Sequence, residues 1–167
     1  MKYFFTYIIL IIALSVRGQY YGVYQNEKDS LVNVIITNNY IKVTYQFDFE
    51  CEFIGPHTLL EEKYSIKEDS IFLFENMNEP IFVILSDEKI QSISDNIPRI
   101  NNKSLFYCRR RVNKDNTKTI YMGEGFENGR KNGNWIYFLD KDAVIVRYNK
   151  GVKIKSDTIT LKSFFGN

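Results

Sequence analysis

The sequence has few of the residues that most often perform catalysis or bind metals. Its 167 residues include one histidine, His57, and two cysteines. A Ser-His-Asp site would have to be built on His57, which lies in a predicted loop, and no Gly-x-Ser-x-Gly motif accompanies it. Cys-x-x-Cys, His-x-x-x-His and phosphate-binding glycine-rich motifs are also missing. We therefore expect no catalytic residue, no metal and no cofactor, although Glu50 and Glu52 keep a glycosidase-like hydrolase open as a third alternative.

The sequence also lacks an apolar run long enough for a membrane-spanning helix. Its main apolar run covers residues 3–14, whereas a span needs about 20 residues. This length is typical of a signal peptide, and the small residues Val16 and Gly18 fit the −3 and −1 positions of a cleavage site. We predict a signal peptide over residues 1–18, cleavage after Gly18, and a secreted or periplasmic protein without a transmembrane helix. The alternative is an uncleaved N-terminal anchor, because Arg17 follows the apolar run.

An excess of basic charge is missing from the predicted mature chain. The full sequence has 22 Lys and Arg residues and 20 Asp and Glu residues, and the predicted leader contains Lys2, Arg17 and no acid. The mature chain is therefore neutral, and it lacks the basic character of most nucleic-acid-binding proteins. Arg109, Arg110 and Arg111 form a local basic cluster. We interpret this cluster as the solvated end of a strand or, alternatively, as a site for an anionic partner.

Proline is scarce and aromatic residues are abundant, as is typical of β-sheet proteins: there are 3 prolines, 12 tyrosines and 13 phenylalanines. From residue 41 to residue 53, apolar and polar residues alternate strictly, which predicts a long strand with one buried face. Other short apolar runs, separated by turn residues, occupy 31–36, 64–66, 71–74, 81–85, 90–93, 105–112 and 119–123. Only residues 59–63 suggest a helical turn. The pattern predicts a mainly β fold over residues 19–120: an antiparallel sheet, a small barrel or a sandwich.

The two cysteines, Cys51 and Cys108, are predicted to form a disulfide, because exported proteins keep their cysteines oxidised. The bond would close a loop of about 58 residues. The loss of chain entropy in the unfolded state would then stabilise the fold by roughly 4 kcal/mol. The alternative is that both cysteines are buried free thiols.

The segment 123–138, GEGFENGRKNGNWIYF, has the strongest turn signals in the chain. Asn128-Gly129 and Asn132-Gly133 are typical hairpin turns, because Asn and Gly tolerate a positive φ. Further turn residues at 140–142 and 149–151, where the glycine is Gly151, predict that the chain continues as a β-meander. Residues 126–131 also align with residues 148–153, a repeat of 22 residues that is typical of stacked units.

This segment, over about residues 121–154, resembles the bacterial variant of the MORN repeat, with units of the form Tyr-x-Asn-Gly-Lys-x-x-Gly-x-Trp-x-x-Tyr. The residues that match directly are Phe126, Asn128, Gly129, Gly133 and Trp135. Arg130 replaces the lysine, Tyr137 lies one place early, and the second unit lacks its Gly-x-Trp. The resemblance implies stacked β-hairpins with aromatic residues between them. Family members are linked to protein interaction, membrane-lipid contact and antitoxin activity, of which the export signal disfavours the last.

These observations predict an exported, non-enzymatic binding or interaction module of the cell envelope or extracellular space. Its antiparallel β domain at 19–120 would carry a MORN-like hairpin segment at 121–167, packed on the first domain. The candidate partner surface consists of Trp135, Tyr137, Arg109, Arg110 and Arg111, although core packing is the favoured interpretation of the two aromatic residues. The alternative is a small-ligand carrier with a lipocalin-like barrel, in which the aromatic residues of 45–53 line a cavity.

Overall fold

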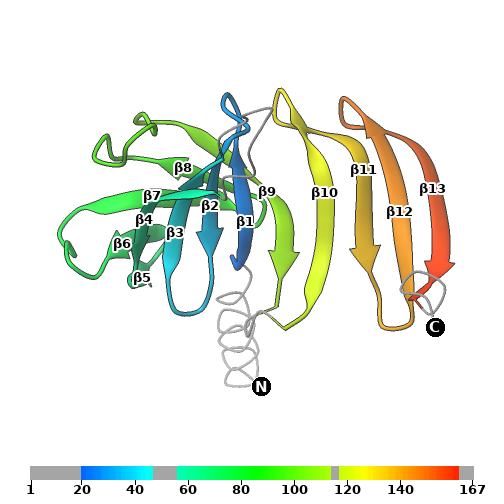
Figure 1. The fold of residues 1–167 in the computed structure, drawn as a ribbon, viewed down its shortest axis with the longest axis horizontal. Helices are drawn as coiled ribbons and strands as arrows, with labels where there is room; N and C mark the ends of the chain where they lie inside the picture. Colours follow the sequence, from blue (N-terminus) through cyan, green and yellow to red (C-terminus); the bar gives the residue numbers. More distant parts are fainter. Residues whose placement is uncertain (1–19, 47–55, 114–116, 162–167) are drawn as a thin grey trace, which may run out of the picture.

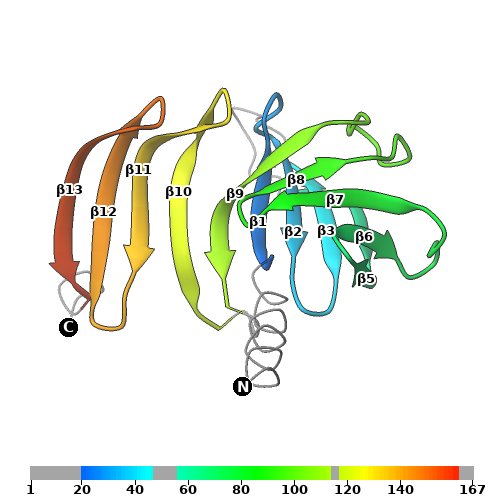
Figure 2. The same cartoon turned by 180° about the vertical axis from the view of Figure 1, so that it is seen from behind.

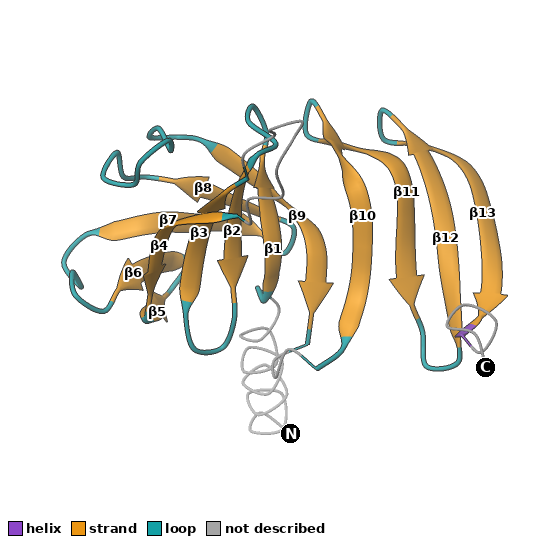
Figure 3. Ribbon diagram, in the orientation of Figure 1, coloured by secondary structure: helices purple, strands orange, loops and turns teal. Residues whose placement is uncertain are grey.

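The computed structural model describes residues 20–46, 56–113 and 117–161 of the chain (Figure 1). Its thirteen strands form one antiparallel sheet that does not close into a barrel, which confirms the predicted mainly β class. Where the connections are described, turns and loops join consecutive strands (Figure 3). Within the described ranges, no helix is long and apolar enough to span a membrane. The strands are β1 (Gly22–Asn26), β2 (Val32–Ile36), β3 (Ile41–Tyr45), β4 (His57–Glu62), β5 (Tyr64–Lys67), β6 (Ser70–Leu73), β7 (Pro80–Ser86), β8 (Lys89–Ser92), β9 (Leu105–Val112), β10 (Thr119–Glu127), β11 (Arg130–Phe138), β12 (Asp142–Asn149) and β13 (Val152–Thr160).

The sheet divides at β9. One edge of β9 pairs with β1 over residues 106–111. The other edge pairs with β8 over residues 105–107 and with β10 over residues 110–112. The strands β1–β4 and β5–β8 therefore form two arms that start from the same strand and lie at one end of the molecule, while β10–β13 extend from it as a meander (Figures 1 and 2).

The hydrophobic core lies in the part formed by the two arms. Its fully buried side chains include Tyr24, Val34, Ile36, Ile41, Val43, Ile71, Phe82, Ile90 and Phe106. The rings of Phe82 and Phe106 meet edge to face, with centroids 5.7 Å apart. Burying each such side chain stabilises the fold by about 1.5–3 kcal/mol relative to leaving it exposed. One cluster thus holds the strands of both arms together, and it reaches Tyr121 and Trp135 in the meander.

The predicted strand over residues 41–53 is confirmed as β3 for its first five residues, and residues 47–55 lie outside the described ranges. The predicted helical turn at 59–63 is wrong, because most of these residues belong to β4. Leu60 pairs with Val43 of β3, and His57, expected in a loop, begins β4 opposite Tyr45. The neighbouring strand β3 offers a full set of backbone partners, and this pairing outweighs the weak helical preference of so short a segment.

The meander β10–β13 continues the sheet without a break. β10 pairs with β9, so hydrogen bonds cross the boundary between residues 120 and 121 at which the sequence suggested a second domain. The meander is built from two hairpins that repeat. Their turns are Asn128-Gly129, with φ of 49° and 71°, and Lys150-Gly151, with φ of 50° and 86°. Two positive φ values are the signature of the two-residue turn that fits strand twist, so the 22-residue repeat is a repeat of one hairpin geometry.

The predicted turn at Asn132-Gly133 is wrong. Both residues lie inside β11, and the register between β10 and β11 shifts between the pairs Gly123–Trp135 and Gly125–Asn132. Two residues of β11 therefore face Glu124 alone, which is the arrangement of a β-bulge. Gly133 has a φ of 74° and supplies the left-handed backbone that such a bulge requires.

Candidate functional site

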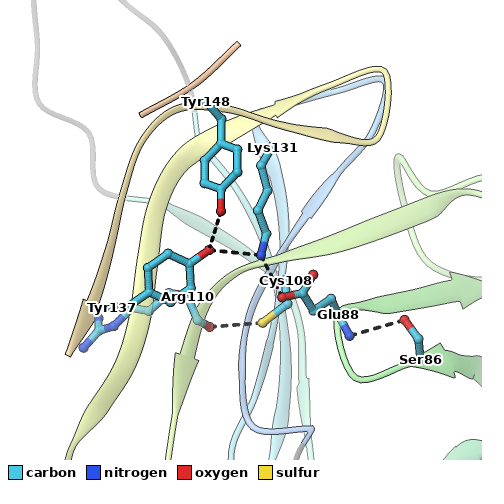
Figure 4. A network of polar contacts seen from close by, with 7 residues as sticks. All are labelled: Ser86, Glu88, Cys108, Arg110, Lys131, Tyr137 and Tyr148. Atoms are coloured by element: carbon cyan, nitrogen blue, oxygen red, sulfur yellow. Dashed lines mark hydrogen bonds and ion pairs between the residues drawn. The ribbon is translucent and has the colours of Figure 1, made fainter. Parts of the chain in front are cut away.

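The β7–β8 turn reaches across to the meander and makes a polar junction with it (Figure 4). Lys131 Nζ on β11 donates to Glu88 Oε1 of this turn at 2.9 Å and to Tyr137 Oη at 3.3 Å. The hydroxyls of Tyr137 and Tyr148 lie 3.5 Å apart, so the chain of contacts continues to β12. Residues 43 positions apart in the sequence thereby fix the first hairpin of the meander to one arm of the core.

Lys131 also lies above a cluster of aromatic rings. Its Nζ is 4.7 Å from the centroid of Trp135, 5.4 Å from that of Tyr121 and 5.6 Å from that of Tyr137. The lysine side chain is only 20% exposed, so these cation–π contacts are partly desolvated and each is worth about 1 kcal/mol. The charge of Lys131 therefore contacts three aromatic rings of the meander at once.

Trp135 is fully buried and packs over the backbone of Gly123. Its ring contacts Phe126 with a centroid distance of 5.1 Å, and its Nε1 donates to the carbonyl of Asn132 at 3.2 Å. A side chain with no exposed area offers no contact to a partner, so the burial supports the core-packing role of Trp135. Tyr137 is half-buried, and its hydroxyl is occupied by Lys131 and Tyr148.

The arginine cluster is split between solvent and interior. Arg109 and Arg110 are exposed, and the Arg110 guanidinium donates to Thr119 Oγ1 at 3.0 Å. Arg111, in contrast, is 5% exposed. The register between β1 and β9 shifts so that Cys108 pairs with Tyr24 and Arg110 with Val23, which leaves Arg109 as an extra residue. This bulge turns Arg111 inward, and the prediction of a solvated strand end is wrong for this residue.

Arg111 is a buried cation with unused hydrogen-bond donors. Within the described residues, its Nε and Nη2 have no hydrogen-bond partner, and neither has the hydroxyl of Tyr121, whose ring centroid is 5.9 Å from the guanidinium. Both residues line a cavity of about 390 Å³ together with Asp87, Glu88, Val112, Asn113 and Ile120. Buried donors without partners cost on the order of 1–3 kcal/mol each, so they call for a physical explanation.

Cys108 lies next to this cluster as a free thiol. The structure shows no Cys51–Cys108 disulfide, and Cys51 lies outside the described residues. Cys108 is fully buried, and its Sγ donates to the carbonyl of Arg110 at 3.4 Å. Burial raises the pKa of the Cys108 thiol, and the positive charge of Arg111 opposes the rise only in part. A buried, protonated thiol is a poor nucleophile, so Cys108 contributes to packing.

Other candidates for chemistry are dispersed. No group of three or more metal-ligating side chains occurs in the part of the chain that the structure describes. His57 is exposed on β4, and Glu61 forms a 2.7 Å ion pair with Lys42 on the surface. Glu50 and Glu52, the paired acids of the hydrolase alternative, lie outside the described residues.

The outer edge of the meander is the second notable surface. β13 has nine residues and pairs only with β12 among the described strands. It is exposed along almost its whole length, including Val152 at 68% and Ile154 at 58%. Lys155 and Asp157 form a 2.8 Å ion pair on this strand. Over residues 152–158, an exposed edge of this kind leaves a row of backbone donors and acceptors available to another strand.

The turn residues named from the sequence position these features. Asn128, Gly129 and Gly151 form the hairpin tips, whereas Asn132 links the two hairpins, because its Oδ1 accepts from the Lys150 amide at 3.2 Å. The Lys131–Glu88 junction and the Arg111 cavity could not be read from the sequence. Comparisons with protein-family models, with curated proteins and with solved structures found no match to this chain.

Proposed function

We propose that this protein is an exported, non-enzymatic interaction module that binds other protein through the free edge of its MORN-like meander. The observation that carries the proposal is β13, a strand of nine residues that is exposed along almost its whole length and that pairs, among the described strands, with β12 alone. Strand addition at such an edge is a common mode of protein recognition, in which backbone hydrogen bonds supply affinity and side chains supply specificity. The same unpaired edge would otherwise invite unselective aggregation.

The partner that the charges favour is a second copy of the chain. An antiparallel pairing of two β13 strands about a twofold axis at Ser156 places Lys155 of each copy opposite Asp157 of the other. The exposed apolar residue Ile154 then faces Thr158, and Ser156 faces its own copy. Opposite charges directly across an antiparallel pair stabilise it, and the twofold axis forms each contact twice.

Charge reversal tests the pairing directly. The measurement is sedimentation of the protein over a range of concentrations. We expect a concentration-dependent dimer and at least about a tenfold higher Kd for Asp157→Lys, because two like-charge contacts replace two ion pairs. The double variant Lys155→Asp/Asp157→Lys restores opposite charges across the axis and should recover the dimer.

The matched control is Lys118→Asp, which removes another exposed ion pair, with Asp140, away from the β13 edge. Exposed pairs of this kind contribute little to stability, so the variants should stay folded and the control should dimerise normally. A monomer at every concentration would overturn the proposal, as would a Kd that Asp157→Lys leaves unchanged. Dimers of the double variant as weak as those of the single variant would also contradict it.

Export has its own test. Mass spectrometry of the protein recovered from outside the cytoplasm should give Gln19 as the first residue, since we place signal cleavage after Gly18. Recovery of the intact N-terminus in the membrane fraction would replace this proposal with the uncleaved anchor.

A further inference from the structure

The tip of the first hairpin presents an amide side chain to solvent. Asn128 is exposed, and among the described residues no hydrogen bond uses its side chain. The equivalent position in the second hairpin holds Lys150, whose side chain pairs with Glu127 at 3.3 Å. The two tips therefore share a backbone geometry but differ in chemistry, and the first tip carries an unoccupied amide.

The fold requires a glycine directly after this amide. Gly129 has a φ of 71°, and a Cβ atom built on it would lie 2.5 Å from the hydroxyl oxygen of Tyr107. A glycine has no side chain to shield its own backbone nitrogen. Among the described residues, no hydrogen bond uses the Gly129 amide, whereas the Gly151 amide at the second tip donates to the carbonyl of Lys131 at 2.8 Å. The Gly129 nitrogen is therefore open to the preceding side chain.

From this arrangement we infer that Asn128 is a site of spontaneous deamidation. The Gly129 nitrogen bonds to Cγ of Asn128, the bond from Cγ to Nδ2 breaks, and the leaving group takes up the amide proton and departs as ammonia. Water then opens the five-membered imide ring at either carbonyl, which gives aspartate or isoaspartate. Either product adds a carboxylate at the tip, near Glu27, whose Oε1 lies 3.3 Å from the Cβ position of Gly129. The reaction needs no co-reactant except water and does not depend on the proposed function.

The other Asn-Gly pair of the chain, Asn132-Gly133, is held against the same reaction. The Oδ1 of Asn132 accepts from the Lys150 amide at 3.2 Å, and its backbone carbonyl accepts from Trp135 Nε1, also at 3.2 Å. Gly133 lies within β11, opposite Tyr148 of β12. The side chain and the peptide group must both be released before they can react. We therefore expect Asn132 to react at least about tenfold more slowly than Asn128 in the folded protein.

Peptide mapping by mass spectrometry compares the two sites within one molecule. The intact protein is incubated in mildly alkaline buffer, with and without urea, and is then digested with trypsin. Residues 119–130 and 132–141 fall in separate peptides, because trypsin cleaves after lysine and arginine. In the folded protein, acid should accumulate at residue 128 at least about ten times faster than at residue 132. In urea, where the structure no longer protects Asn132, the two rates should be similar.

The variant Lys150→Asn is the matched control, because it creates an Asn-Gly pair at the tip of the second hairpin. There the glycine amide is hydrogen-bonded, so the created pair should react more slowly than Asn128 in the same sample. Equal rates at residues 128 and 132 in the folded protein would overturn the inference. So would an Asn128 that stays unmodified in the folded protein while the unfolded chain reacts, or a created pair that reacts as fast as Asn128.

Discussion

Gly123 is the position at which one added methyl group should disturb the fold most clearly. It lies on β10 directly opposite Trp135 of β11, and the indole ring covers it. A Cβ atom built on Gly123 would lie 2.3 Å from both Cδ2 and Cε2 of Trp135. Carbon atoms in contact prefer a separation of about 3.5–4.0 Å, so Gly123→Ala requires the ring to move by more than about 1 Å.

The cost follows from the burial of Trp135. The ring is fully buried, and it contacts both Tyr121 and Phe126. Overpacking of a filled core costs about 1–3 kcal/mol, and complete loss of a buried tryptophan costs about 3–5 kcal/mol, which sets the upper limit. We expect Gly123→Ala to lower the free energy of unfolding by about 2–4 kcal/mol. With a urea dependence of about 2 kcal/mol per molar, the unfolding midpoint should fall by about 1–2 M.

Urea unfolding followed by tryptophan fluorescence measures this effect, because Trp135 is the single tryptophan of the chain. The matched control is Gly125→Ala on the same strand, where the nearest atom to the added Cβ is Gln25 Oε1 at 3.4 Å. This ordinary contact should change stability by less than about 1 kcal/mol. Equal midpoints for Gly123→Ala and Gly125→Ala would refute the packing of Trp135 over β10.

Three further outcomes follow from the buried polar groups. Replacing Lys131 with Met should lower the free energy of unfolding by about 1–3 kcal/mol, because it removes the ion pair with Glu88 and the cation–π contacts but keeps most of the packing. Thermal unfolding measures the effect, and an unchanged Tm would contradict the contact between Lys131 and Glu88. Burial raises the pKa of Tyr24 above its usual value of 10.0. The stabilisation by its protonated form is therefore complete below about pH 10, and above that pH stability should fall by up to about 1.4 kcal/mol per pH unit, less steeply in Tyr24→Phe. In a Cys51→Ser variant, Cys108 should react with a thiol reagent only after denaturation, and rapid labelling of the folded protein would show that the thiol is accessible.

Strand positions were predictable because one-sided burial imposes a period of two on the sequence. The run at 105–112 coincides with β9, and 81–85 falls within β7. The hairpin tip at Asn128-Gly129 was predictable for a different reason, because its backbone conformation restricts which residues can stand there. Both signals depend only on neighbours in the sequence.

β-Bulges interrupt the period of two on which these predictions depend. Alternation from the buried Cys108 would place Arg110 inside and Arg111 outside, but the extra residue at Arg109 reverses the order. Gly133 was read as a turn for a similar reason, since a glycine with positive φ serves a tight turn and a bulge equally well. The division of the sheet at β9 was also not predictable from the sequence, because it depends on three strands, β1, β8 and β10, that all pair with β9. The cavity beside Arg111 results from these non-local features, and this is why the sequence did not reveal it.

The repeat itself accounts for the exposure of β13, the outermost of the described strands. A shift of 22 residues takes the pair Gly123–Trp135 in the first hairpin to the pair Ile145–Asp157 in the second. The position of the buried tryptophan is thus occupied by a carboxylate, and the position of Gly133 by Lys155. A third hairpin stacked on the second would meet charges where the first offers an aromatic ring, so continued stacking is disfavoured. Charged residues on an edge strand also discourage unselective pairing. In the dimer that we propose, the same two charges would favour a twofold pairing in which Lys155 meets Asp157 of the second copy.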